Sequence, residues 1–205
     1  YRNAAEGRPG VFVSFEEHED DLRLNAAALG LDVPALEAAG RLTCYHAAVP
    51  PDAVQAGQFS IQGLLAVLDG QMRAVQAELV VIDAADVLMR VFGDAERERN
   101  ELSLLHDWLR RRGLTAVLTA KTTNEGRPHY PFLTFAADCV LYLDQRMRGQ
   151  VRTRRLNVVK YRGSGFLANE HPYVITSAGV VLLPVSSMSL EQEFGDDRLP
   201  TGCAA

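Results

Sequence analysis

Residues 79–83 read Leu-Val-Val-Ile-Asp, an unbroken apolar run that ends in a carboxylate. Four apolar, mostly β-branched residues in succession predict a strand covered on both faces, as strands of parallel sheets are. Asp83 stands at the carboxyl end of this strand, where open α/β sheets bind their ligands. A polar group at a ligand-binding edge and a simple helix N-cap are equally good interpretations of this aspartate.

Strands and helices alternate on either side of this run. Short β-rich runs predict strands, and apolar residues at helical spacing predict helices. Predicted strands cover residues 11–15, 42–46 and 115–120, and predicted helices cover 19–29, 61–76 and 94–112. A hairpin (139–143 with 151–160) and a ribbon (173–176 with 180–183) follow. We therefore expect an α/β fold, a largely parallel sheet flanked by helices, with antiparallel edge strands.

Composition narrows the class of protein. Hydrophobic residues make up 47% of the 205 residues, and the net charge is −5. The acidic balance disfavours a nucleic-acid partner. The three cysteines lie far apart without a CxxC pair, which suits a reduced cytoplasm. No apolar run reaches about 18 residues, so we expect a cytoplasmic protein with no membrane span.

Glu16 and Glu17 follow the predicted strand 11–15. Adjacent residues of an extended chain point to opposite faces, so only one of them can face a pocket shared with Asp83. A carboxylate beside a metal-holding aspartate could orient or deprotonate an attacking water. The alternative is an acidic first turn of the next helix, which the helix dipole favours.

Lys160 and Arg162 share one face of a strand that runs into Gly163. Two cations beside a flexible glycine indicate a phosphate clamp. A solvated, charged edge strand is the alternative, and we prefer that interpretation for the arginines nearer the strand's start. Those arginines are Arg152, Arg154 and Arg155.

One motif is absent from the 205 residues. The phosphate-binding pattern G-x-x-x-x-G-K-[ST] does not occur. The two lysines are Lys121 and Lys160, and neither follows a glycine.

Taken in order, these segments resemble the KaiC family of RecA-like P-loop ATPases. Each matching segment is short, but together they span about residues 5–185 in the family's order. They are residues 9–17, 25–30, 80–83, 118–121, 138, 160–164, 172–176 and 179–180. The resemblance implies a RecA-like fold with ATP bound between the subunits of a hexameric ring.

The resemblance also implies roles for particular residues. It implies that Glu16 is the catalytic base and that Glu17 supports it. It also implies that Asp83 helps to bind Mg²⁺-ATP. It implies that Lys160 and Arg162 reach the neighbouring subunit's nucleotide, with further nucleotide contacts. Those further contacts are Tyr161, Ser164 and Thr176. Phe166, Ala28 and Ser177 depart from the family's clock members, which leaves the details of the adenine and phosphate contacts open.

The resemblance implies a domain over residues 1–185, whose P-loop part precedes residue 1. Residues 186–205 are then a linker and the start of a second KaiC-type domain. We also expect the strands 79–83 and 115–120 to lack a ladder partner, and residues 1–205 alone to be inactive.

The leading functional prediction is ATP hydrolysis with Mg²⁺ by a ring-forming protein in signalling or clock-like regulation. Signalling or clock proteins are its expected partners, and the parent could be a serine/threonine kinase. The alternatives are a non-catalytic, ATP-gated interaction module and, less favoured, a RecA/RadA-like DNA recombination ATPase. The short loop 122–127 offers few cations for gripping a phosphate backbone.

Overall fold

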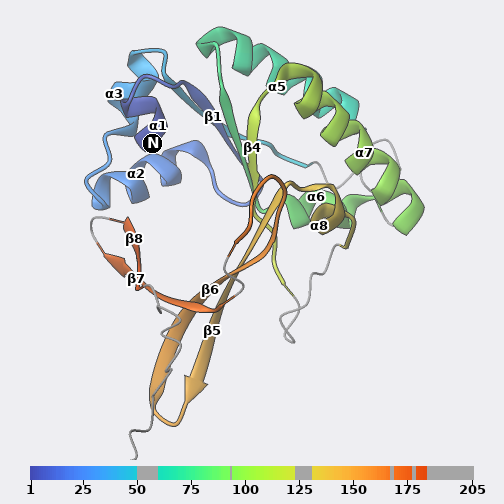
Figure 1. Cartoon of the computed structure of the whole chain (residues 1–205). Coiled ribbons are helices and arrows are strands. Elements are labelled where there is room, and N and C mark those ends of the chain that lie inside the picture. Colours follow the sequence, from blue (N-terminus) through green and yellow to red (C-terminus); the bar gives the residue numbers. More distant parts are fainter. Residues whose placement is uncertain (50–59, 93, 123–130, 167–168, 177–178, 184–205) are drawn as a thin grey trace, which may run out of the picture. The chain divides into compact units, whose positions relative to one another are not determined.

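The structure, a computed structural model, describes residues 1–49, 60–92, 94–122, 131–166, 169–176 and 179–183 (Figure 1). It divides into two compact units. The first holds Tyr1–Val140 and Lys160–Ser164, and the second holds Leu141–Val159 and the described residues from Gly165 onward. The expected domain boundary at 185/186 lies outside the described residues.

A four-stranded parallel sheet forms the centre of the first unit. Its order is β2-β1-β3-β4, and every neighbouring pair runs parallel. The strands are β1 (Gly10–Ser14), β2 (Leu42–His46), β3 (Leu79–Asp83) and β4 (Thr115–Leu118). The register sets Ser14 opposite both His46 and Asp83, and Ile82 opposite Leu118. The predicted α/β class with a parallel sheet is confirmed.

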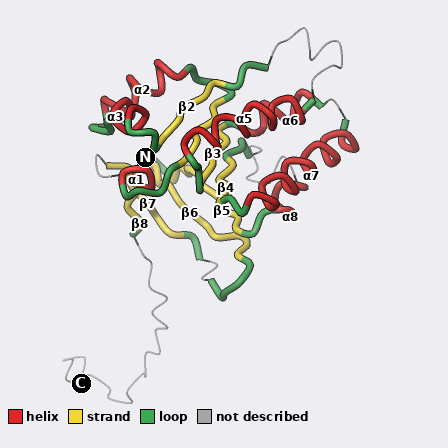
Figure 2. Tube along the Cα trace, turned by 90° about the horizontal axis from the view of Figure 1, so that it is seen from above, coloured by secondary structure: helices red, strands yellow, loops and turns green. Residues whose placement is uncertain are grey.

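Helices cover this sheet from two sides (Figure 1). On one side lie α1 (Arg2–Ala5), α2 (Glu19–Ala28) and α3 (Val33–Ala38); on the other lie α5 (Ile61–Val75) and α7 (Ala95–Arg112). Helices α5 and α7 run side by side in both ribbon views (Figure 2). The short helices α6 (Ala85–Val91) and α8 (Pro131–Ala136) complete the unit.

Helix ends follow the signals in the sequence. The side chain of Asp94 accepts a hydrogen bond from the backbone N–H of Arg97 at 2.8 Å, as an N-cap does. Gly113 ends the same helix with φ 63°, a left-handed conformation that glycine adopts without strain. The short helices α3 and α6 were not predicted, because six or seven residues are too few to show a helical period.

The main core lies between the sheet and helices α5, α6 and α7. Val80 and Ile82 of β3 are buried in it, whereas Val81 on the opposite face is only half-buried. The strand is thus covered on both faces, but only partly on the second. The opposite face carries a smaller cluster under α1 and α3, and it is made of Ala4, Val33, Leu36 and Leu42.

The strand pairing in the parallel sheet tests the expectation that strands 79–83 and 115–120 lack a ladder partner. Strand β3 pairs with β1 on one side and with β4 on the other, so the prediction that 79–83 lacks a partner is wrong. Strand β4 pairs with β3 along one edge, and no strand within the described ranges pairs with its other edge. Val117 of β4 is 47% exposed.

Antiparallel strands form a sheet of their own, with the order β5-β6-β7-β8. They are β5 (Cys139–Arg148), β6 (Val151–Tyr161), β7 (His171–Thr176) and β8 (Gly179–Leu182). The predicted hairpin and ribbon are confirmed, and both hairpin strands are longer than predicted. Gly149 provides the left-handed turn of the hairpin, with φ 61°. Among the described helices, none combines the length and the apolar character that crossing a bilayer requires.

Candidate active site

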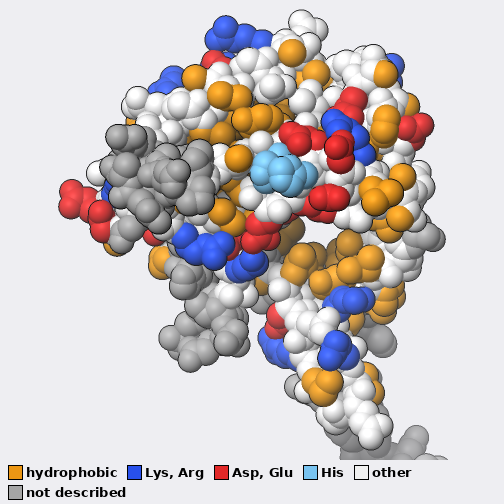
Figure 3. Space-filling view, turned by 180° about the vertical axis from the view of Figure 1, so that it is seen from behind, with side chains coloured by type: hydrophobic (Ala, Val, Ile, Leu, Met, Phe, Trp, Pro, Cys, Tyr) orange, Lys and Arg blue, Asp and Glu red, His pale blue; other side chains and the backbone are white. Residues whose placement is uncertain are grey.

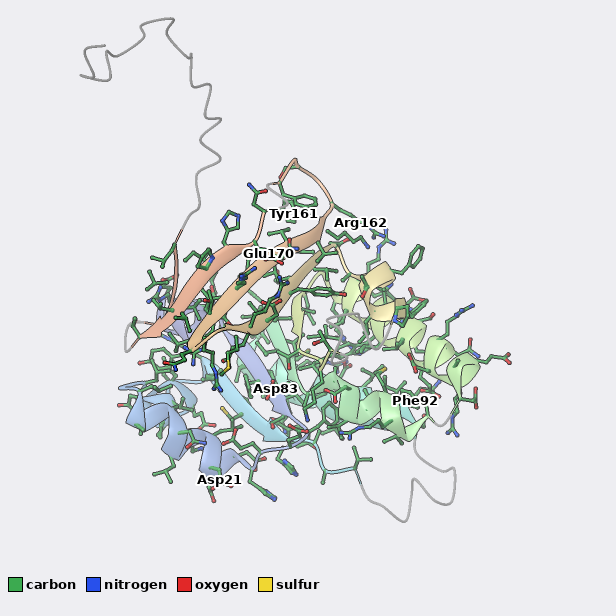
Figure 4. All side chains as sticks on the ribbon, turned by 90° about the horizontal axis from the view of Figure 1, so that it is seen from below. Asp21, Asp83, Phe92, Tyr161, Arg162 and Glu170 are labelled. Atoms are coloured by element: carbon green, nitrogen blue, oxygen red, sulfur yellow. The ribbon has the colours of Figure 1, made fainter. Side chains whose placement is uncertain are left out.

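Asp83 ends β3 at a sharp turn (Figure 4). The next residue, Ala84, has φ 57°, a left-handed conformation that costs a non-glycine residue about 1–2 kcal/mol. The hydroxyl of Thr119 donates to Asp83 Oδ1 at 2.6 Å and accepts from the Ala84 N–H at 2.9 Å. The N-cap of α6 is Ala84, so the alternative role of Asp83 as a helix cap is wrong.

Glu16 reaches the segment that follows β4. Lys121 Nζ lies 2.7 Å from Glu16 Oε1, and the two side chains are 66% and 48% exposed. This hydrogen bond, and then the lysine's charge, lowers the pKa of Glu16. Thr119 and Lys121 are two residues apart, so one short segment contacts both Asp83 and Glu16.

Glu17 turns toward other partners. Its backbone N–H donates to Ser14 Oγ at 2.9 Å, and its carboxylate accepts a hydrogen bond from the side chain of Asn25 in α2. The two glutamates therefore diverge, in a bend that follows the end of β1 rather than along an extended strand. Glu16 joins the edge that carries Asp83, and Glu17 is held by α2.

Two stacked histidines brace the turn after β1. The rings of His18 and His46 lie 4.1 Å apart at 24°, and His46 Nδ1 is 3.0 Å from the Glu17 carbonyl oxygen. Glu19 accepts the His46 backbone N–H at 2.7 Å, which lowers the pKa of Glu19. Figure 3 shows histidine side chains gathered with acidic side chains around them.

Lys160 and Arg162 meet at the carboxyl end of α8. Lys160 Nζ donates to the carbonyls of Thr134 and Phe135 at 3.0 and 2.7 Å. Arg162 donates to the Phe135 carbonyl at 3.0 Å and to Asp138 Oδ1 at 3.3 Å. Cations stabilise a helix at this end, where carbonyls lack intrahelical partners. Figure 4 shows Arg162 beside α8.

The remaining predicted residues are dispersed. Tyr161 is 47% exposed between the two cations. Ser164 follows Gly163, whose φ of 113° suits only glycine. Thr176 belongs to the second unit, where its hydroxyl donates to the Gly179 carbonyl at 3.1 Å. The structure thus brings together Glu16 with Asp83, and separately Lys160 with Arg162.

Thr119, Lys121, Asn25 and His46 were not proposed as site residues from the sequence. The positions of Thr119 and Lys121 in the sequence could have indicated their place in the site. Both follow β4 directly, and the strand next to β3 in a parallel sheet ends at the same edge as Asp83. Asn25 and His46 both contact Glu17, in the turn after β1. These contacts depend on how α2 and β2 pack, which the sequence does not indicate.

The oxygen donors at the edge fit a hard cation. Asp83 supplies a carboxylate and Thr119 a hydroxyl, both of which suit Mg²⁺. Within the part of the chain that the structure describes, no three His, Cys, Asp or Glu residues form a metal-binding group. Two protein oxygens are enough for Mg²⁺, which keeps several waters and takes further oxygens from substrate phosphates.

Comparisons with known proteins agree with this architecture. The model of the KaiC ATPase family matches residues 1–187, and the chain belongs to that family. It is 33% identical over 203 residues to the circadian clock protein KaiC2 of a Synechocystis strain, a match covering 98% of this chain and 36% of that protein. It is 30% identical over 197 residues to the circadian clock oscillator protein KaiC of Parathermosynechococcus lividus, covering 95% and 36%. The chain thus spans little more than a third of these relatives' length.

The bridge made by the Thr119 hydroxyl yields a prediction. Thr119→Val keeps the shape but leaves the Ala84 N–H and Asp83 Oδ1 without this partner, and should lower the free energy of unfolding by about 1 kcal/mol. Thr119→Ser retains the hydroxyl and serves as the control. Urea unfolding measures both variants. Equal stability of the Val and Ser variants would contradict the bridging role.

Proposed function

We propose that this chain is the hydrolytic part of a ring-forming KaiC-type ATPase that binds Mg²⁺-ATP at the carboxyl edge of β1, β3 and β4. One observation carries the proposal. A carboxylate paired with Lys121, Glu16, and a strand-end carboxylate, Asp83, follow neighbouring strands and are linked through residues 119–121. This is the combination that phosphoryl transfer to water needs, a water-orienting base beside a metal-holding aspartate.

In the proposed reaction, Glu16 accepts a proton from the attacking water. The water oxygen bonds to the γ-phosphorus while the bond from that phosphorus to the bridging oxygen of ADP breaks, so the products are ADP and inorganic phosphate. Glutamate is deprotonated at neutral pH, the state that a base requires, and the ion pair with Lys121 lowers the pKa of Glu16 further. Asp83, oriented by Thr119, would hold the Mg²⁺ that neutralises phosphate charge.

Glu17 has a supporting role in this proposal. Its carboxylate is engaged by Asn25, and its backbone contacts Ser14 and His46. These contacts shape the turn that presents Glu16. The phosphate-cradling loop would come from chain outside residues 1–205, since no such motif occurs within them.

Lys160 and Arg162 would act across a subunit boundary. They form a cluster at α8, distinct from the Glu16–Asp83 edge, and the guanidinium of Arg162 is half exposed. Arginine carries five N–H donors, so its contacts with Phe135 and Asp138 leave donors for a phosphate. A cluster that serves the neighbouring subunit's nucleotide defines a head-to-tail interface, the kind of interface from which rings are built. Tyr161, Ser164 and Thr176 would add nucleotide contacts.

The biological setting follows from the relatives' names. Two relatives are named as circadian clock proteins, which supports a clock-like or signalling role for the full-length cytoplasmic protein. We propose a homohexamer with residues 1–185 as one ATPase domain and residues 186–205 leading into a second. Serine/threonine kinase activity would belong to the whole protein.

The role of Glu16 can be tested in the full-length protein. Glu16→Gln keeps the size of the side chain but removes the base, so ATP turnover should fall at least about 100-fold while ATP binding persists. Steady-state hydrolysis and equilibrium nucleotide binding measure the two effects. Glu17→Gln is the matched control, and its turnover should fall far less, because its carboxylate faces α2. The assignment is refuted by a Glu16→Gln protein that turns over ATP at the wild-type rate.

Action across the subunit boundary predicts complementation. Rings of Arg162→Ala alone or Glu16→Gln alone should both be inactive, because every interface lacks one group. Mixed rings should regain hydrolysis, since some interfaces then combine an intact Glu16 with an intact Arg162. Activity is measured against mixing ratio, with mixed rings verified by native mass spectrometry. If verified mixed rings have no activity, Arg162 and Glu16 act on the nucleotide of the same chain, and action across the subunit boundary is contradicted.

A further inference from the structure

The ion pair between Lys121 and Glu16 joins two segments that are 105 residues apart in sequence. Glu16 follows β1 and Lys121 follows β4, and β3 lies between these strands. The pair therefore spans the strand end that carries Asp83. Its Nζ–Oε1 distance is 2.7 Å, a normal length for a charge-assisted hydrogen bond.

The backbone near Lys121 is firmly placed. The Thr119 N–H donates to the Ile82 carbonyl at 3.0 Å, and the Thr119 carbonyl accepts from the Ala85 N–H at 2.8 Å. The N–H of Lys121 itself donates to Asp86 Oδ1 at 3.4 Å, and Asp86 is only 4% exposed. The hydrogen bonds of Thr119 hold the backbone two residues before Lys121, and a buried carboxylate of α6 makes a longer contact with the N–H of Lys121.

The pair acts on Glu16 more than on folding. Both side chains are well exposed, and exposed ion pairs contribute little to stability. A free glutamate side chain samples many rotamers, whereas a general base must lie within reach of the water it deprotonates. Arg90 adds a weaker positive field, and Asp86 lies near the lysine. The hydrogen bond from Lys121 is the largest cause of the lowered pKa of Glu16.

We propose that Lys121 is a positioning residue for hydrolysis, whose ammonium holds one oxygen of Glu16 and leaves the other oxygen to accept the proton of the attacking water. This role rests on the proposed function of Glu16. It makes residues 119–121 a single support, in which Thr119 orients Asp83 and Lys121 orients Glu16.

The first test needs no nucleotide. Carbon-13 NMR titration of the Glu16 carboxyl in the full-length protein should give a pKa below the ordinary range, and Lys121→Met should move it back up. Lys121→Arg keeps the charge and should keep the pKa low. An identical Glu16 titration in wild type and Lys121→Met would overturn the proposal.

The second test measures catalysis in the same proteins. Lys121→Met should lower kcat on the order of tenfold with little change in KM, because orientation of the base is lost and binding is not. The acid limb of the kcat profile should move to higher pH, as the pKa of Glu16 rises. Lys121→Arg should restore both. Arg73→Met, which removes an exposed cation paired to Asp69 on α5, is the matched control and should leave both unchanged.

Two results would overturn the role of Lys121. An unchanged kcat would make the pair a surface contact only, and an increased kcat would make the lysine a restraint on Glu16. If Glu16→Gln is inactive, either result refutes the lysine's role alone. If Glu16→Gln hydrolyses ATP normally, the proposed function fails, and the positioning role fails with it.

Discussion

The parallel register of β1, β3 and β4 is the constraint on which the candidate site depends. Ser14 lies opposite Asp83, and Ile82 lies opposite Leu118, so the three strands end almost level. Strands that run in one direction and end together deliver the residues after them to one edge. Glu16, Asp83 and residues 119–121 meet there for this reason. A slip of one residue in β3 would turn Val80 and Ile82 out of the core, so the core itself holds the register.

Thr119 turns this alignment into a defined geometry. The left-handed backbone at Ala84 is unfavourable. Thr119 offsets it by donating a hydrogen bond to Asp83 and accepting hydrogen bonds from the backbone N–H groups of Ala84 and Ala85. The same short segment continues to Lys121, which pairs with Glu16. The cluster of Lys160 and Arg162 is built differently, on the carbonyls at the end of α8. In the proposed ring, each chain would contribute one cluster to its own nucleotide and the other to its neighbour's.

Most of the fold could be predicted from the sequence, because local signals were strong. The apolar run 79–83, the Asp94 cap and the turn at Gly149 each specify their own element. Glu16 and Glu17 do diverge, but they lie in a bend after β1, so the divergence comes from the bend and not from strand alternation. Strand order did not follow, since no local pattern says that β3 has partners on both sides. The position of Lys121 after β4 could indicate the edge of Asp83 only once β4 was known to lie next to β3, and its partner Glu16 is 105 residues away.

The most direct test of the account is a structure of the full-length protein with Mg²⁺ and a non-hydrolysable ATP analogue, determined by electron cryomicroscopy. The account predicts nucleotide and metal at the carboxyl edge of β1, β3 and β4. Asp83 should lie next to the metal, and Glu16, still paired with Lys121, should face the γ-phosphate. Nucleotide bound elsewhere in the domain, with Glu16 directed away from the γ-phosphate, would contradict it.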